Sequence, residues 1–466
     1  MKRINLGQMI LSLVLIVFSA FTVILILFDV NKPFYYDFLF LLPLTFLFLS
    51  IFCNQLYRLI PSNLGVSIII ILFFCRMVIT PLLFTIADYP ATITKNIESN
   101  TTYSIFLICY EAFAIFSFLL YKVIHKKPLT TSIEHSKKLN YKYFLLLLLI
   151  LFLILLIIKI TPEILLAYRT VFQINDEYFV NFEDAQITKK YGTTFIKKLS
   201  LTTGFYLTRA AIILFPAYGI IFFSQKKHTA LNKFISLILC FTPLFFIAGA
   251  IAKSLIYMIC LFLLRSYLYP SKRQNFKLLL TITIGGTVAI AWWLFRVSAN
   301  NIKSTEIVSF FATRFMTYFS GVNIVSGVFN LPKDLVYKLR YFLYDYLDSI
   351  PYGNTIFDLS HEGIQTFFNF YNNTFGQIPT TIGMGWYYFG PIFSPLYSII
   401  FSYISYQSGE RVKIERNPFK RLRLLLMIFY FAMGIIMYNI EITFTSFFSL
   451  FLPMYFMERI AYKKEK

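Results

Sequence analysis

Residues 141–160 read YKYFLLLLLILFLILLIIKI, a stretch that is apolar at every position from Phe144 to Ile158. A helix needs about 20 such residues to cross the ~30 Å hydrocarbon layer of a bilayer. Further segments of this kind predict an all-α polytopic membrane protein with about 12 transmembrane helices. The expected spans are 9–28, 34–53, 66–87, 103–123, 141–160, 200–224, 234–250, 254–269, 278–296, 384–406, 423–440 and 444–457.

Basic residues are concentrated in the loops between alternate segments. With the N-terminus inside, the inner loops hold 26 of the 43 lysines and arginines, together with five acidic residues. Their net charge of +21 equals that of the whole chain. Because positive charge marks cytoplasmic loops, both termini are expected on the cytoplasmic side of the cytoplasmic (inner) membrane. Anionic lipid headgroups, rather than nucleic acid, are the expected partners of these loops.

The composition excludes a soluble domain. Hydrophobic residues make up 58% of the chain and the mean hydropathy is +0.67, whereas soluble chains are about half apolar. The first apolar run lacks a small-residue cleavage site, and we interpret it as a retained helix. The five cysteines show no Cys-x-x-Cys spacing, so neither disulfides nor a metal cluster are expected. Residues 1–466 are expected to form a single integral membrane domain.

Two long outer loops, 161–199 and 297–383, mix charged and aromatic residues. Within the second loop, 310–322 carries apolar residues at helical spacing, and so does 335–348, which stops before Pro351. Both stretches predict amphipathic helices that lie on or dip into the outer leaflet.

Two further stretches predict breaks in apolar sequence. Residues 234–269 are interrupted by Gly249-Ala-Ile-Ala-Lys-Ser254 and flanked by basic residues on both sides. A hairpin of two short helices that turns at the outer face fits these flanks and places Lys253 at the outer mouth of the bundle. Glycines and prolines are dense in 372–391, which predicts irregular backbone leading into the tenth span.

Three ionisable residues interrupt the spans at matching depth. Arg76, Glu111 and Arg209 each lie about 8–11 residues from the outer end of their span, roughly 12–17 Å below the interface. An ionisable group inside a span costs roughly 2.5–3.5 kcal/mol, so each one requires a reason. Two interpretations are open: a structural Arg–Glu pair that holds helices together, or an arginine at the floor of an outward-facing cavity.

A second basic set lies nearer the outer surface, where positive charge opposes the insertion bias. It comprises Lys253, Arg296, Arg314 and Arg340, with Arg209 deeper. Arginine forks and lysine ammonium groups match phosphate and pyrophosphate, so the set predicts an anionic ligand. The alternative is local: Arg296 snorkels at a helix end, and Arg340 pairs with an acid such as Asp345.

The acid–base candidates lie in the same outer loop. They are Asp345, Asp348, His361 and Glu362. Each can accept the proton of an attacking hydroxyl group, and separation along the chain does not choose among them. The aromatic residues Trp386, Tyr387 and Tyr388 either form the floor of a sugar-binding site or pack in the core. The sequence contains no phosphate-binding Gly-Lys-Ser/Thr loop, no Gly-x-Ser-x-Gly and no His-Glu-x-x-His, so cytosolic nucleotide hydrolysis is not expected.

The layout resembles the Wzy-type polysaccharide repeat-unit polymerases, also called O-antigen or capsular polysaccharide polymerases. The resemblance covers roughly 150–455 and rests on the turn Gly249–Ser254, Arg296 at a span end, Phe311-Ala-Thr-Arg314, and Gly376–Gly390 before the next helix. Lys253 stands where relatives often have arginine. The Arg-x10-Gly pattern of some members is missed by one residue at Arg209…Gly219 and by two at Arg314…Gly327.

The resemblance implies a lipid-dependent, C-type glycosyltransferase-like bundle that polymerises oligosaccharide repeat units on undecaprenyl pyrophosphate at the outer face. The growing chain would pass from its lipid pyrophosphate to the non-reducing sugar of a new lipid-linked unit. A residue within 345–362 would deprotonate the acceptor hydroxyl. The leaving pyrophosphate would be stabilised by Lys253, Arg296, Arg314, Arg209 and Arg340.

No metal or cofactor is required by this scheme, and a flippase and a chain-length regulator are candidate partners. A lipid-linked oligosaccharide flippase is the alternative in the transporter class. The long outer loop and the lack of a two-halves repeat argue against it. The third hypothesis for the same features is another lipid-dependent glycosyltransferase or a ligase.

Overall fold

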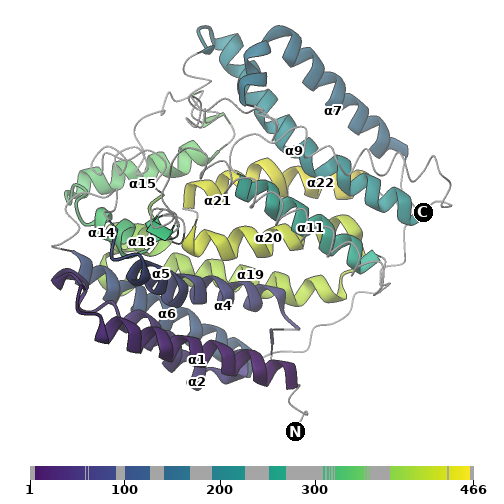
Figure 1. Cartoon of the computed structure of the whole chain (residues 1–466). Coiled ribbons are helices and arrows are strands. Elements are labelled where there is room, and N and C mark those ends of the chain that lie inside the picture. Colours follow the sequence, from purple (N-terminus) through teal and green to yellow (C-terminus); the bar gives the residue numbers. More distant parts are fainter. Residues whose placement is uncertain are drawn as a thin grey trace.

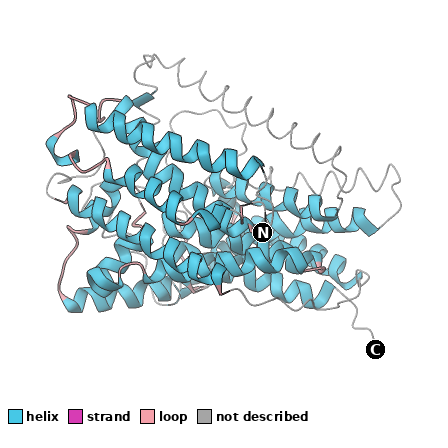
Figure 2. Cartoon of the chain, turned by 90° about the horizontal axis from the view of Figure 1, so that it is seen from below, coloured by secondary structure: helices cyan, strands magenta, loops and turns pink. Residues whose placement is uncertain are grey.

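A computed structural model shows the architecture of the chain (Figure 1). The structure describes residues 6–57, 59–60, 62–90, 100–125, 141–167, 191–225, 251–268, 308–309, 312–313, 315, 319, 321–350, 352–353, 356, 378–437 and 440–461. Within these ranges every regular element is a helix, and Figure 2 shows helices joined by loops.

The helices follow the chain in this order: α1 (Leu6–Phe28), η1 (Phe34–Tyr36), α2 (Leu41–Phe52), α3 (Asn54–Tyr57), α4 (Leu64–Phe74), η2 (Cys75–Ile79), α5 (Thr80–Ile86), α6 (Thr101–Ile124), α7 (Tyr141–Ile160), η3 (Pro162–Ala167), α9 (Phe195–Gln225), α11 (Ile251–Leu268), α14 (Val322–Val328), α15 (Leu335–Ser349), α18 (Thr381–Phe393), α19 (Leu396–Ile414), α20 (Pro418–Ile436), α21 (Ile440–Ser446), η5 (Phe447–Phe451) and α22 (Leu452–Ala461). The elements η2 and η5 are π-turns, and each comes shortly before a proline.

Six helices of the described chain are long and apolar enough to cross a membrane. They are Ile10–Phe28, Phe34–Phe52, Leu64–Ile86, Thr101–Ile124, Lys142–Ile160 and Phe195–Ile221. They coincide with the first six expected spans, and they confirm a helical membrane protein by length and composition. The seventh and ninth expected spans lie outside the described residues, and the total of twelve stays a prediction.

The helices α19 and α20 form the centre of the bundle. In Figure 1, α1, α2, α4, α5 and α6 lie on one side of this pair, and α11, α21 and α22 lie on the other. The helices α7 and α9 pack on each other at the far edge, with α9 also contacting α11, α20 and α22. The short helix α14 and the helices α15 and α18 gather at one end of the bundle.

Small residues let α19 approach α4 closely. The buried face of α19 carries Ser398, Ser402, Ser405, Ser408 and Gly409. Opposite it, a Cβ atom on Gly65 would lie only 2.2 Å from the Ser405 carbonyl oxygen. Membrane helices commonly meet through such small-residue faces, because in lipid their association depends on close packing rather than on the hydrophobic effect.

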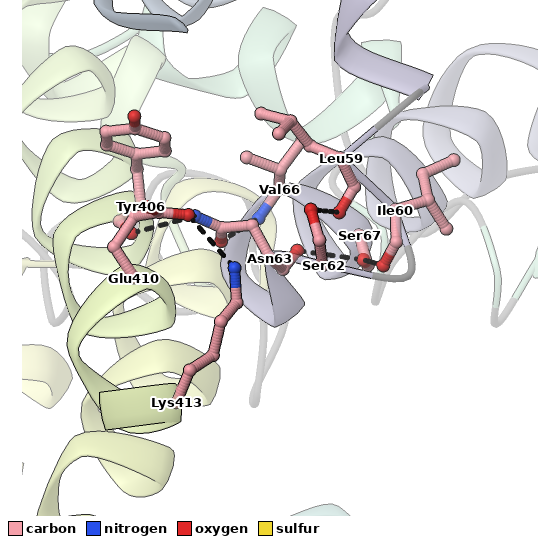
Figure 3. Close-up of polar contacts among 9 residues, drawn as sticks. All are labelled: Leu59, Ile60, Ser62, Asn63, Val66, Ser67, Tyr406, Glu410 and Lys413. Atoms are coloured by element: carbon pink, nitrogen blue, oxygen red, sulfur yellow. Dashed lines mark hydrogen bonds and ion pairs between the residues drawn. The ribbon is translucent and has the colours of Figure 1, made fainter. Parts of the chain in front are cut away.

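A buried asparagine fastens the first turn of α4 to α19, as Figure 3 shows. Asn63 caps α4 by accepting a hydrogen bond from the Val66 amide at 3.2 Å. Its side-chain amide donates to the Glu410 carboxylate at 2.8 Å and to the Tyr406 carbonyl at 3.2 Å. Lys413 neutralises the same carboxylate at 3.2 Å. One side chain therefore caps one helix and ties it to a second.

The second predicted amphipathic helix, 335–348, is confirmed as α15. Its polar residues face the protein interior. Asp334 caps its start, and it ends at Ser349, before Pro351. Tyr341, Asp345 and Ser349, one turn apart, are buried, whereas Leu335, Val336, Leu339 and Leu343 are 56–69% exposed. A helix that turns apolar residues outward and polar residues inward is suited to a lipid surface. The first predicted amphipathic helix, 310–322, lies largely outside the described residues.

The prediction for the tenth span is wrong in its bounds. Residues 384–406 are not one helix, because Gly390 adopts a left-handed backbone angle (φ 78°) that kinks α18 before Pro391, and α19 begins only at Leu396. The helix α19 runs from Leu396 to Ile414, eight residues past the expected end at residue 406. Irregular backbone was also wrongly expected from Thr381 to Phe389, which form a helix. Thr380 accounts for this, because its side chain caps the helix by accepting from the Gly383 amide at 3.1 Å.

The expected turn around Gly249–Ser254 also needs correction. The helix α11 begins at Ile251, so the residues from Ile251 to Ser254 are helical. Alanine and lysine are strong helix formers, which explains the early start of this helix. Residues 234–250 lie outside the described residues, and the hairpin itself stays a prediction.

Candidate acid–base site between α15, α18 and α19

The buried face of α15 presents a carboxylate to α18. Asp345 is 2% exposed, and the Tyr388 hydroxyl donates a hydrogen bond to its Oδ2 atom at 2.5 Å. Ser349, one turn further along α15, donates to the Asp345 main-chain carbonyl at 2.6 Å. A buried carboxylate requires hydrogen-bond donors, and Tyr388 is one supplied from another helix.

A second hydroxyl pair ties α15 to α19 beside this carboxylate. The Tyr346 and Tyr397 hydroxyl oxygens lie 3.1 Å apart. Burial, together with the nearby charge of Asp345, raises the pKa of Tyr346, so its hydroxyl keeps its proton at neutral pH. The Asp345 carboxylate is therefore surrounded by neutral phenols rather than by phenolates.

Aromatic rings wall the rest of the site. Phe342 meets the Tyr388 ring edge-on at 5.3 Å, and Tyr387 donates its hydroxyl to the Pro332 carbonyl at 2.6 Å. Two cations stand on the same helix. The Lys338 ammonium lies 5.4 Å from the centroid of the Tyr387 ring, and the Arg340 guanidinium lies 5.4 Å from that of Tyr344. The helix α15 therefore carries aromatic rings and cations close to the buried Asp345 in sequence, with Tyr388 and Phe342 in contact beside it.

The structure describes only part of the predicted site. Asp345 and Arg340 share α15, and Asp348 lies in the last turn of that helix, with its side chain outside the description. Lys253 lies in the first turn of α11, likewise without a described side chain, and Arg209 is partly exposed on α9. The remaining predicted residues fall outside the described residues: Arg296, Arg314, His361 and Glu362.

Sequence reasoning missed Tyr388, which donates to Asp345, and the neighbouring hydroxyl pair of Tyr346 and Tyr397. The sequence predicts for Tyr388 only a role in a sugar site or in core packing, and it gives Tyr346 and Tyr397 no role. The sequence offers one weak signal, because Tyr346 follows Asp345 directly. Tyr388 is 43 residues away along the chain, so only the packing of α18 on α15 brings it to the carboxylate.

The buried charges at mid-span form a structural pair. The Arg76 Nη1 and Glu111 Oε2 atoms lie 2.5 Å apart, and both side chains are 0% exposed. Arg76 sits in the π-turn η2, just before Pro81, which has no N–H to continue an α-helix. This pairing favours the first of the two interpretations of these charges. Arg209, the third ionisable residue predicted at this depth, lies on α9, which packs on α7 and α11.

The pair continues into a chain of hydroxyl groups. Ser398 of α19 donates to the Glu111 carboxylate, and its oxygen lies 2.9 Å from that of Thr381 on α18. Thr381 in turn donates to the Ile435 carbonyl on α20 at 2.8 Å. Tyr388, which donates to Asp345, lies on α18, and Tyr397, which contacts Tyr346, precedes Ser398 on α19. The same two helices therefore carry this network and the tyrosines near Asp345.

Within the described part of the chain, no three His, Cys, Asp or Glu side chains gather into a group that could hold a metal ion. No family model, curated protein or solved structure matches this chain.

Proposed function

We propose that the chain is a glycosyltransferase that polymerises undecaprenyl-pyrophosphate-linked oligosaccharide repeat units at the outer face of the cytoplasmic membrane. In this proposal twelve helices span the membrane, both termini are cytoplasmic, and the loop 297–383 is extracytoplasmic. The observation that carries the proposal is the Asp345 carboxylate, buried in that loop region and held by Tyr388 at 2.5 Å.

The charges at the helix ends support the proposed topology. The helices α6, α11, α19 and α22 all run inward in this arrangement, and each carries a basic residue in its last turn. Basic residues at cytoplasmic helix ends follow the charge rule for membrane insertion. Lys159 at the outer end of α7 is an exception to this pattern.

The outward face of α15 supports a lipid-borne substrate. Leu335, Leu339 and Leu343 lie on one face, exposed, and an exposed apolar face of this kind is stable against the acyl chains of the outer leaflet. Asp345 lies on the opposite face, within the thickness of one helix. A lipid-linked sugar held at the membrane surface would therefore meet α15 without leaving the leaflet.

Asp345 is the proposed general base. It takes the proton of the acceptor hydroxyl as that oxygen attacks the anomeric carbon of the growing chain, and the bond from this carbon to the pyrophosphate oxygen breaks. The pyrophosphate leaves on its lipid. Fixed cations neutralise its charge in the proposal, namely Lys253, Arg296, Arg314, Arg209 and Arg340. Tyr388 orients the carboxylate through its hydrogen bond, and Asp348, His361 and Glu362 remain the other candidates for the base.

Deleting the gene and separating the surface glycan on a gel tests the proposal. Single lipid-linked units that accumulate on the outer face are expected for a polymerase. Units that stay on the inner face would instead identify a flippase, and an unchanged glycan would refute both.

Complementation of the deletion then tests Asp345. Loss of a general base costs about 10²–10⁴-fold in rate, so Asp345→Asn should fail to restore long polymer while the protein remains in the membrane. The matched control is Asp37→Asn, because Asp37 is an exposed acid at the outer end of the second span. Full polymer length with Asp345→Asn would remove this residue from the mechanism.

A further inference from the structure

The helices α7 and α9 are fastened to each other at both ends. At one end Gly204 of α9 packs against Ile157 and Ile164, so closely that a Cβ atom would lie 2.2 Å from the Ile164 side chain. At the other end the Tyr143 hydroxyl donates to the Leu214 carbonyl at 3.3 Å, and its ring lies 5.3 Å from that of Tyr218. Between these two contacts the facing side chains do not close the gap.

A cavity of about 430 Å³ occupies this gap, bounded on its third side by η5 and α22. Along α9 it extends from Tyr206 to Leu214, about 12 Å at 1.5 Å per residue. Ala210 stands at the middle of that wall and fills little of the space. The lining is apolar over most of its length, including Leu146, Ile150, Leu207, Ala210, Phe448 and Met457.

One end of the cavity lies next to the turn that follows α15. Tyr352 lines the cavity there, with its ring 5.8 Å from that of Tyr206 and its hydroxyl 3.0 Å from the Thr203 hydroxyl. Its backbone is left-handed (φ 66°), which is costly for a residue with a side chain. The turn at Tyr352 thus gives this end a polar rim, seven residues beyond Asp345 on the chain.

The size and chemistry of the cavity restrict its occupant. A helix about 10 Å across would fill such a volume within roughly 5–6 Å, about one turn, so the cavity does not accommodate a partner helix. Water is disfavoured as well, because an ordered water needs two to four polar partners and the lining offers few. A thin, flexible hydrocarbon chain fits, and the side chains of Leu145, Leu149 and Phe152 on α7 are exposed and apolar, as residues that face lipid are.

We propose that this cavity binds the isoprenoid chain of the lipid that carries the substrate. The proposal rests on the function proposed above, and it assigns the lipid part of the ligand to a site. The chain lies between α7, α9 and α22, with its pyrophosphate end at the rim formed by Tyr206 and Tyr352. From there the attached sugar reaches toward the inward face of α15.

Photo-crosslinking tests the assignment. A photoreactive leucine analogue bearing a diazirine replaces Leu207, which lines the cavity, or Leu149, which is 50% exposed on α7 and does not line it. The purified protein is placed in phosphatidylglycerol vesicles with or without undecaprenyl phosphate, and adducts are identified by mass spectrometry. An isoprenoid adduct at position 207, enriched at least tenfold over position 149, is expected. Equal isoprenoid labelling at both positions, or phospholipid adducts alone at 207, would overturn the proposal.

Filling the cavity gives a second measurement. Ala210→Phe places a ring in the middle of the lining and should reduce the isoprenoid adduct at position 207 at least tenfold. An undiminished adduct in this variant contradicts the assignment. If the variant does not fold, the crosslink at position 207 in the protein with Ala210 intact still tests the proposal. The readout is separate from polymerisation. An isoprenoid adduct in a chain whose deletion leaves the glycan unchanged supports the cavity and refutes only the proposed function.

Discussion

Glu111→Leu, made alone, is expected to leave the Arg76 guanidinium buried without its carboxylate. Both side chains are 0% exposed, so solvent does not screen the remaining charge. Breaking a buried pair in this way costs about 3–5 kcal/mol. Since whole proteins are stable by only about 5–15 kcal/mol, the variant should lose much of its abundance in the membrane. Arg76→Leu alone should show a comparable loss.

Removing both charges should recover most of that loss. The double variant Arg76→Leu with Glu111→Leu replaces the pair with apolar side chains, a change that is often neutral or stabilising. Ser398 loses its carboxylate acceptor but keeps the Thr381 hydroxyl at 2.9 Å. The coupling energy from the four-variant cycle should therefore be close in size to the sum of the two single-variant losses.

The assay is the thermal unfolding of purified protein in detergent, together with membrane abundance. Lys32→Leu is the matched control, because its pair with Asp37 spans 3.8 Å and Asp37 is 61% exposed. Exposed pairs contribute about 0–1 kcal/mol, so this control should change little. Additive losses in the double variant, or single losses as small as that of the control, would refute a structural role for the pair.

Three further outcomes are expected. Gly409→Ala should destabilise the protein by about 1–3 kcal/mol, because its Cβ would lie 2.1 Å from the Asn63 Oδ1 atom; an unchanged melting temperature would contradict that packing. A spin label at Leu339 should collide with oxygen more readily than with a water-soluble nickel complex, and the opposite order would remove α15 from the lipid surface. A cysteine at Lys333, in a background without native cysteines, should react with an impermeant thiol reagent on intact cells, whereas one at Arg411 should react only after lysis; the reverse pattern would invert the topology.

The six apolar helices that are long enough to span and the helix α15 were predictable because their signals are local. Apolar length sets a spanning helix, and the helical spacing before Pro351 sets the end of α15. The matching depth of Arg76 and Glu111 was also predictable, since each residue advances a helix by about 1.5 Å. Their actual contact confirms that depth is a useful constraint when charges lie in apolar segments.

The remaining features depend on tertiary packing or on single backbone angles. Hydropathy does not reveal the kink at Gly390 inside α18, because glycine and proline interrupt an apolar stretch without changing its average polarity. Thr380, which caps α18, is a residue type that favours the start of a helix, and it is the local signal for α18 in the sequence. The contact between Tyr388 and Asp345 has no local signature, since it arises only when α18 packs on α15.

Polymerisation by the purified protein is the most direct measurement of the central claim. Lipid-linked single repeat units, extracted from the deletion strain, are incubated with the protein in vesicles and the products are separated by size. The wild-type chain should produce a ladder of lengthening products. Asp345→Asn should produce none within the same time, and Asp37→Asn should match the wild type. A wild-type protein that leaves the single units unchanged, or an Asp345→Asn variant that extends them at the normal rate, would contradict the account.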